Sequence, residues 1–116
     1  MINSEYYNFK IKIMILIYTV CKNKTEAKKI AKMLIKLKLA ACANLWPMES
    51  VYRWREKIIE DREVAMILKT RKNYYKKIES VIKKIHSYEV PCILRINPDQ
   101  VEGEYEKWLV RETKFI

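Results

Sequence analysis

Glycine is almost absent from this chain: its 116 residues contain a single glycine, Gly103, close to the C-terminal end. Loops that wrap around phosphate groups need several glycines, because the backbone must approach the ligand closely. The aromatic, glycine-containing signature of an RNA-recognition motif is missing for the same reason. A phosphate-binding loop and a typical RNA-recognition motif are therefore not expected.

Cysteine and histidine are also scarce. The three cysteines, Cys21, Cys42 and Cys92, are odd in number, widely spaced and without a CxxC pair, so they indicate neither a disulfide framework nor a zinc module. We expect reduced thiols and a cytoplasmic protein. No Ser/His/Asp order can be assembled with any specificity. An enzyme, for instance an acyl-phosphate hydrolase of ferredoxin-like shape, is one function that we considered. We predict no enzymatic activity.

The chain also lacks a hydrophobic run long enough to span a bilayer, which needs roughly 20 residues. The apolar run from Ile13 to Tyr18 is much shorter, and the residues after it do not form the small-residue cleavage site of a signal peptide. We predict a buried strand there and no membrane association. Residues 1–12 are expected to form a polar, aromatic tail ahead of one domain, residues 13–116.

Positive charge is in excess, with 24 Lys and Arg against 14 Asp and Glu, a formal net charge of +10. Such a balance favours encounters with anions. The lysines are spread over both predicted middle helices, which is more typical of a solvated surface than of a polyanion site. A basic RNA-binding module of ferredoxin-like fold remains the alternative function, although nucleic acid is not the expected partner.

The hydrophobic pattern predicts strands and helices in alternation. A continuous apolar strand, Ile11–Val20, is followed by a helix that Asn23 caps, with Glu26 completing a capping-box pattern, and that ends near Lys38. Two long strands follow, which we expect at Ala41–Trp54, interrupted at Pro47, and at Ile59–Thr70.

The second half continues the alternation. An apolar stripe at helical spacing predicts a second helix, and it consists of Tyr74, Ile78, Val81, Ile82 and Ile85. Pro91 opens a last strand, Cys92–Ile96, and a short helix is expected after Pro98. This order predicts an α+β fold, a ferredoxin-like βαββαβ sandwich with an extra C-terminal helix.

The topology brings chemically interesting residues to one end of the sheet. The end of the first strand, the hairpin tip and the start of the last strand should all lie there. Cys21 follows the first strand, and the single histidine, His86, precedes the last one. A thiolate and an imidazole are suitable ligands for copper(I) or zinc, but two ligands are too few for a closed site. For Cys42 and Cys92, inside predicted strands, packing is the expected role.

Five ordered motifs resemble the CutA family of divalent-cation tolerance proteins. They are Leu39-Ala40-Ala41-Cys42-Ala43-Asn44, Ser50-Val51-Tyr52-Arg53-Trp54-Arg55-Glu56-Lys57-Ile58, Glu63 with Ile67-Leu68-Lys69-Thr70, His86-Ser87-Tyr88-Glu89-Val90-Pro91, and Tyr105-Glu106-Lys107-Trp108. Together they cover essentially all of residues 14–112.

The resemblance implies a PII-like homotrimer with clefts at the subunit boundaries, tolerance of divalent metals such as copper, and no required cofactor. It implies metal contact at Cys21 and His86, and ligand contact at a second set of positions, Trp54, Lys57, Glu63, Lys69, Tyr88 and Glu89. Trp108 also matches, and for both Trp54 and Trp108 burial in the core or at an interface is the favoured role. We expect the lysines to attract an anionic ligand, the aromatic rings to form an apolar wall, and Glu89 to orient His86 or to neutralise a lysine. No partner protein follows from the sequence.

The chain departs from the family pattern at three positions. Glu56 replaces the usual hairpin glycine, so a backbone position that favours positive φ is expected to be remodelled or filled at some cost. Ser87 and Lys22 each stand where the family often has proline. We expect Ser87 to loosen the loop after His86.

Overall fold

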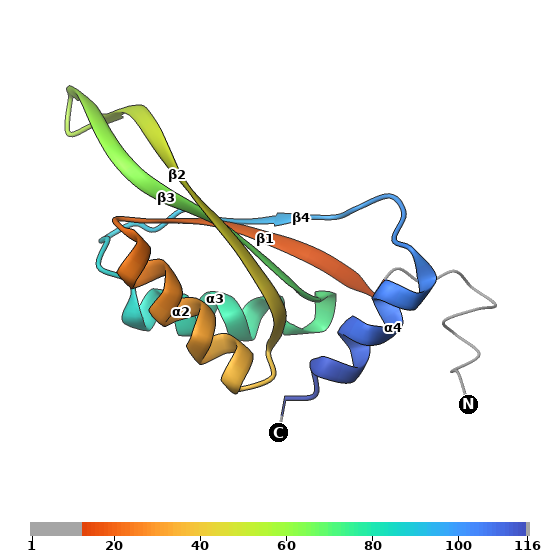
Figure 1. Cartoon of the computed structure of the whole chain (residues 1–116). Helices are drawn as coiled ribbons and strands as arrows, with labels where there is room; N and C mark the ends of the chain where they lie inside the picture. Colours follow the sequence, from red (N-terminus) through yellow and green to blue (C-terminus); the bar gives the residue numbers. More distant parts are fainter. Residues whose placement is uncertain (1–12, 116) are drawn as a thin grey trace.

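The computed structural model describes residues 13–115, which form four strands and four helical segments (Figure 1). The predicted tail, residues 1–12, lies outside this range. The elements are β1 (Met14–Cys21), α2 (Lys24–Lys36), β2 (Ala40–Trp54), β3 (Lys57–Arg71), the 3-10 turn η1 (Lys72–Tyr74), α3 (Tyr75–Ile85), β4 (Ile93–Ile96) and α4 (Gly103–Glu112). The predicted βαββαβ order with an additional C-terminal helix is confirmed.

The strands form one sheet in the order β2-β3-β1-β4, and every neighbouring pair is antiparallel. β1 lies inside the sheet, as its continuous apolar sequence predicted. Helices α2 and α3 cover one face, while α4 lies near the end of the sheet where β1 begins (Figure 1). Within residues 13–115, no helix covers most of the opposite face (Figure 1). Among the described residues, no helix is both long and apolar enough to cross a membrane.

The core lies between the sheet and the two helices. Asn23 starts α2 by accepting a hydrogen bond from the Glu26 N–H at 2.8 Å, and the buried stripe of the helix consists of Ala27, Ile30, Ala31 and Leu34. From α3 the buried side chains are Ile78 and Ile82. Each fully buried Ile or Leu side chain stabilises the fold by about 1.5–3 kcal/mol relative to exposure, so this apolar layer holds the helices on the sheet.

Some predicted boundaries were wrong. β2 runs through Pro47 without a break, and its irregularity lies at the Ala40/Cys42 step instead. A proline is tolerated there because β2 is an edge strand of this sheet, where a residue without an N–H need not break a ladder. Cys92 precedes β4 rather than opening it, and Tyr74 belongs to η1 rather than to α3.

The β2–β3 turn consists of two residues, Arg55 and Glu56, with φ angles of 49° and 69°. Both angles lie in the left-handed region, which glycine occupies at little cost and other residues at a cost. Glu56 therefore fills the position where the resembling family has glycine, as the sequence predicted. The turn is of the primed hairpin type, whose twist suits antiparallel strands.

The β2–β3 hairpin is much longer than the strands beside it and projects beyond them (Figure 1). β1 pairs with β3 only from Val64 to Arg71, so in the described chain residues 57–63 of β3 have a neighbour only in β2. Val51 and Ile58 in this projection are each 71% exposed. The projecting hairpin thus presents strand edges and apolar side chains with no partner inside residues 13–115.

Candidate functional site

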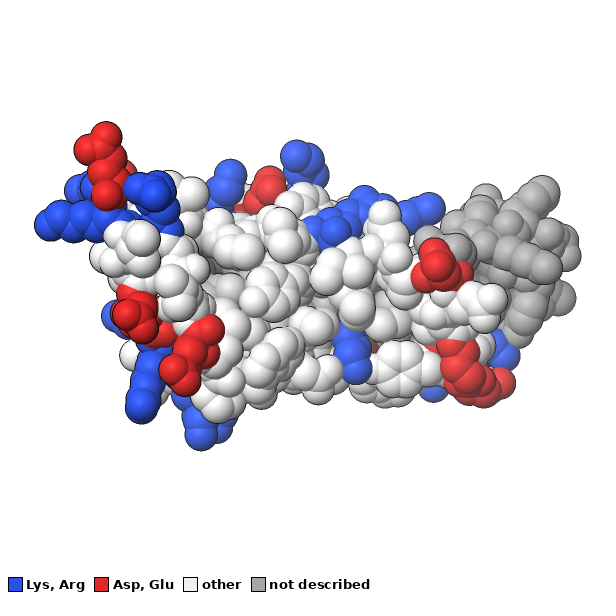
Figure 2. Space-filling view, turned by 90° about the horizontal axis from the view of Figure 1, so that it is seen from above, with Lys and Arg blue, Asp and Glu red and all other residues white. Residues whose placement is uncertain are grey.

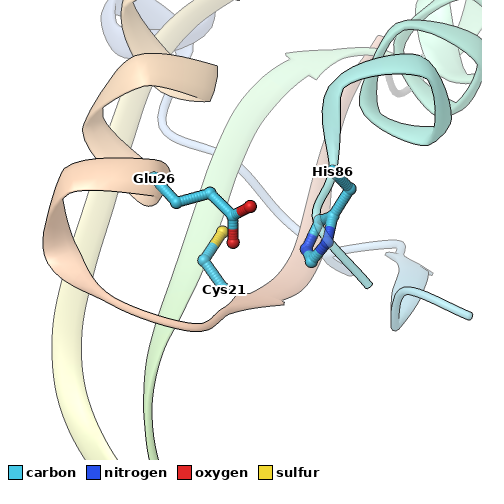
Figure 3. Close-up of side chains that lie close together, drawn as sticks. All are labelled: Cys21, Glu26 and His86. Carbon is cyan, nitrogen blue, oxygen red and sulfur yellow. The ribbon is translucent and has the colours of Figure 1, made fainter. Parts of the chain in front are cut away.

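Three potential metal ligands meet at the end of β1. Cys21 ends that strand, Glu26 lies in the first turn of α2, and His86 follows α3 (Figure 3). The Cys21 sulfur, a Glu26 carboxylate oxygen and a His86 ring nitrogen all lie within 4.8 Å of one another. The topology predicted that Cys21 and His86 would share this end of the sheet, and the structure places them there.

His86 is held by hydrogen bonds on both ring nitrogens. Nδ1 accepts a bond from the Tyr88 N–H at 3.0 Å, which leaves Nε2 to donate to the Val20 carbonyl at 2.7 Å. Both ring nitrogens therefore already have a partner, Nδ1 as acceptor and Nε2 as donor. Glu89 was expected to orient His86 or to neutralise a lysine, but the ring partners of His86 are Val20 and Tyr88, and the Glu89 carboxylate pairs with an arginine, Arg55, at 3.0 Å.

Glu26 was assigned a capping role from the sequence, and the structure gives it a wider one. One carboxylate oxygen accepts from the Lys22 N–H at 3.1 Å and the other from the Ser87 N–H at 2.9 Å. Burial alone would raise the Glu26 pKa, but these hydrogen bonds and the nearby His86 hold that pKa below its ordinary value. Glu26 thus ties the start of α2 to the loop after α3.

Lys22 and Ser87 are two of the departures from the family pattern, and the backbone N–H of each donates a hydrogen bond to Glu26. Proline has no backbone N–H and could donate neither bond to the carboxylate. The loop after His86 is therefore fastened to α2 through Glu26, whereas we expected Ser87 to loosen it.

Cys21 is fully buried, and burial raises the pKa of its thiol to about 12, with further contributions from the charges of Glu26 and Glu63. The thiol is consequently protonated at neutral pH and must lose its proton to bind a metal ion. Sulfur, imidazole nitrogen and carboxylate oxygen together form a donor set that suits zinc or copper. A metal ion bound here would also displace one hydrogen bond of His86.

A separate cavity of about 620 Å³ opens beside this cluster, between the helix-free face of the sheet, the hairpin and the loop after His86. Its lining residues come from four places, namely β1 (Tyr18 and Val20), β2 (Met48, Ser50, Val51, Tyr52 and Trp54), β3 (Glu63) and the loop before β4 (Ser87, Tyr88, Glu89, Val90 and Cys92). Within this lining the Tyr88 hydroxyl donates to the Glu63 carboxylate at 2.6 Å. Uncharged side chains cover most of the middle of this face of the molecule, and charged ones lie mainly at its margins (Figure 2).

The structure brings together four of the six residues predicted to contact a ligand. Trp54, Glu63, Tyr88 and Glu89 all line the cavity. The two predicted lysines, Lys57 and Lys69, are not among the lining residues.

The two lysines and the other matching positions have different surroundings. Lys57 begins β3 at the exposed hairpin tip, and the Lys69 ammonium lies 5.3 Å from the ring centre of Tyr105. Trp108 packs against Tyr105 with the ring centres 5.4 Å apart. Cys42 is half-buried in β2, as expected for packing, whereas Cys92 lines the cavity.

Sequence analysis missed the role of Glu26 in the metal-ligand cluster and the contribution of Tyr18, Met48 and Tyr52 to the cavity. A signal existed for Glu26, which stands five residues after Cys21 at the start of a predicted helix. The cavity residues had no such signal, because their meeting depends on the register between β2 and β3.

The sequence matches the family described as "CutA1 divalent ion tolerance protein" over residues 15–112. A divalent-cation tolerance protein CutA from Pyrococcus horikoshii is 46% identical over 101 residues, which cover 87% of this chain and 99% of that protein. The human protein CutA is 33% identical over 100 residues, covering 85% of this chain and 56% of the human protein.

Solved structures agree with these sequence matches. The crystal structure of CutA1 from Pyrococcus horikoshii superposes with a TM-score of 0.84 at 44% identity, over 86% of this chain and 98% of that one. The periplasmic divalent cation tolerance protein CutA from Archaeoglobus fulgidus superposes with a TM-score of 0.86 at 35% identity, over 88% and 100%.

The match extends over the sheet, both covering helices and α4, so it includes the cluster at the end of β1 and the cavity. The family is one of divalent-ion tolerance proteins rather than of enzymes, in agreement with the prediction of no enzymatic activity. On sequence and structure alike, the chain belongs to the CutA1 divalent ion tolerance protein family.

Proposed function

We propose that this protein contributes to divalent-cation tolerance by taking up copper or another divalent metal at the cluster of Cys21, Glu26 and His86. The observation that carries the proposal is the approach of three donor atoms of different types to within 4.8 Å. Family membership supports the general role, since the relatives are named for divalent-cation tolerance.

The cluster suits a responsive site better than a permanent structural one. Three protein ligands leave one position open on a four-coordinate metal. Binding also requires the Cys21 proton to leave and a His86 hydrogen bond to break, so the affinity depends on pH. Metal binding would therefore pull on the loop after α3 and on the start of α2, and that displacement is a means of signalling metal occupancy.

We also propose that the protein works as a homotrimer, as the family resemblance implies. The support from this chain is the projecting hairpin, whose β3 edge from residue 57 to 63 has no second neighbour among the described residues. Neighbouring copies would supply the missing hydrogen bonds and cover Val51 and Ile58. The cytoplasm is the proposed compartment, supported by three free thiols, although one solved relative is described as periplasmic.

This proposal takes precedence over the RNA-binding alternative. The open face of the sheet carries aromatic rings, as RNA-binding sheets do. However, the charged groups that line its cavity are the carboxylates of Glu63 and Glu89, which repel a phosphate backbone.

Isothermal titration of copper(I), copper(II) and zinc tests the metal site. Wild-type protein is compared with Cys21→Ser, Glu26→Gln and His86→Ala, and with Cys42→Ser as a control cysteine variant outside the cluster. We expect each cluster variant to lose about tenfold or more in affinity for at least one metal, because one ligand of a small set is removed. Identical binding by wild-type protein and all three cluster variants would remove the cluster from the metal site.

A further inference from the structure

The cavity beside the metal-ligand cluster has the opposite charge to the protein as a whole. The chain carries a formal net charge of +10, yet the described residues that line the cavity include no Lys or Arg and two glutamates, Glu63 and Glu89, of which Glu89 is paired with Arg55. We propose that this cavity binds a small organic cation, an ammonium group with short alkyl substituents. The proposal goes beyond metal tolerance, since it concerns a different ligand class and a different set of residues.

Glu63 is the anionic group of the proposed site. It is only 8% exposed, and one carboxylate oxygen accepts the hydrogen bond from Tyr88. Within residues 13–115, no Lys, Arg or His nitrogen forms an ion pair with it. Burying a carboxylate without a cationic partner costs free energy. A cation that enters the cavity can therefore pair with Glu63 without first displacing another cation.

The neighbouring side chains respond to the negative charge of Glu63. Burial raises the pKa of the Tyr18 hydroxyl and of the Cys92 thiol, and the charge of Glu63 adds to the rise in both cases. Two groups on two different segments of the chain, β1 and the loop before β4, therefore lie near this one carboxylate and are held in their neutral forms. The same potential that opposes a phenolate or a thiolate favours an ammonium ion.

Aromatic rings provide the second half of the recognition. Tyr18, Tyr52, Trp54 and Tyr88 all line the cavity, and Trp54 is still 40% exposed. The Trp54 ring already has a cationic neighbour, since the Arg55 guanidinium lies 5.3 Å from its centre. Aromatic faces around a carboxylate attract alkylammonium groups through cation–π interactions.

The same lining disfavours a bare metal ion. Calcium and magnesium need six or more oxygen ligands, whereas here one oxygen of the single buried carboxylate is already bonded to Tyr88. Much of the remaining wall is apolar and comes from Val20, Met48 and Val90. Methyl or methylene groups on a nitrogen can pack against such a wall, but hydration water cannot.

Choline and its neutral isostere 3,3-dimethyl-1-butanol test the proposal, because they share a shape and differ in charge. Each is titrated into the full-length protein in its native assembly, at low salt and with EDTA present so that metal binding has no influence. The readouts are calorimetry and the indole N–H resonance of Trp54 in NMR spectra. We expect choline to bind and the neutral isostere to bind about tenfold or more weakly.

Two variants assign the site. Glu63→Gln keeps the shape of the side chain and should weaken choline binding by about tenfold or more. Lys69→Gln, on the same strand but outside the cavity lining, should leave it unchanged. Equal binding of choline and its isostere, or no binding of either at millimolar concentration, would overturn the proposal. Light scattering of Glu63→Gln tests a different occupant of the cavity. If wild type does not bind choline and Glu63→Gln dissociates into smaller assemblies, the cation that pairs with Glu63 belongs to a partner subunit, and the proposal is overturned.

Discussion

At the end of β1, the backbone N–H groups of Lys22 and Ser87 both donate to Glu26. These two residues stand where the family often has proline, so the chain gains two hydrogen bonds that the proline-containing pattern cannot form. Hydrogen bonds therefore hold the Glu26 and His86 side chains in place before any metal binds. Cys21 is the buried member of the cluster, and its protonation state decides what the cluster can do.

The Cys21 thiol should resist alkylation in the folded protein. Its pKa is raised from 9.0 to about 12, so at pH 8 its thiolate fraction is about a thousandfold smaller than that of an unperturbed thiol. Reactivity should increase as the pH rises toward 12, because the reactive form is the thiolate. Iodoacetamide labelling followed by peptide mass spectrometry measures the rate at Cys21 against that at Cys42. In urea the two rates should become similar, whereas equally rapid labelling in the folded protein would contradict the buried, protonated thiol.

At the scale of elements, the hairpin shows a local conflict between sequence and backbone. Arg55 and Glu56 both adopt positive φ although neither is glycine. The long β2–β3 ladder, paired from Ala40 with Thr70 to Trp54 with Lys57, imposes this geometry on the two residues between the strands. The ladder outweighs the preference of the two residues because a two-residue connection between antiparallel strands has few alternative conformations.

Replacing Glu56 by glycine should stabilise the protein. The left-handed conformation costs a residue with a Cβ about 1–2 kcal/mol, and the greater flexibility of unfolded glycine offsets about 0.5–1 kcal/mol of the gain. We therefore expect Glu56→Gly to raise the free energy of unfolding by up to about 1 kcal/mol, as measured by urea denaturation at fixed protein concentration. The matched control is Glu60→Gly in the extended part of β3, which should destabilise the protein. A loss of stability in Glu56→Gly would contradict the assigned turn.

At the scale of the whole molecule, the described chain is elongated, with principal extents of 54 × 27 × 21 Å. Much of that length comes from the hairpin, which leaves the body of the sheet (Figure 1). Trp46, Leu94 and Ile96 on the helix-free face are also substantially exposed. A single copy thus leaves both a strand edge and an apolar surface in water, and association with other copies would cover them.

A charge in the projecting hairpin should disrupt the proposed trimer without unfolding the subunit. Ile58 is 71% exposed in the single chain, so Ile58→Asp removes little packing from the subunit itself. We expect size-exclusion chromatography with light scattering to give three times the subunit mass for wild type and a lower mass for the variant. Leu37→Asp, at an exposed apolar residue after α2 on the helical side, should keep the wild-type mass. A monomeric wild type at micromolar concentration would contradict the trimer.

The sequence by itself determined the order of elements, the position of β1 inside the sheet and the start of α2 at Asn23. These features depend on local periodicity and on capping residues, which act within a few positions along the chain. Topology also sufficed to bring Cys21 and His86 to one end of the sheet, because crossover connections leave little choice of strand direction.

Only the tertiary structure decided which groups complete the site. Glu26 joins the cluster because its carboxylate accepts a hydrogen bond from Ser87 in the loop after His86. Glu26 and Ser87 are 61 residues apart in the sequence. Glu63 and Tyr88 meet, while Lys57 and Lys69 remain outside the cavity, because the strand register and the course of the loop after α3 set these distances. Residue type shows what a side chain can bind. Its neighbours, which depend on long-range packing, decide whether it is buried, charged and within reach of a ligand.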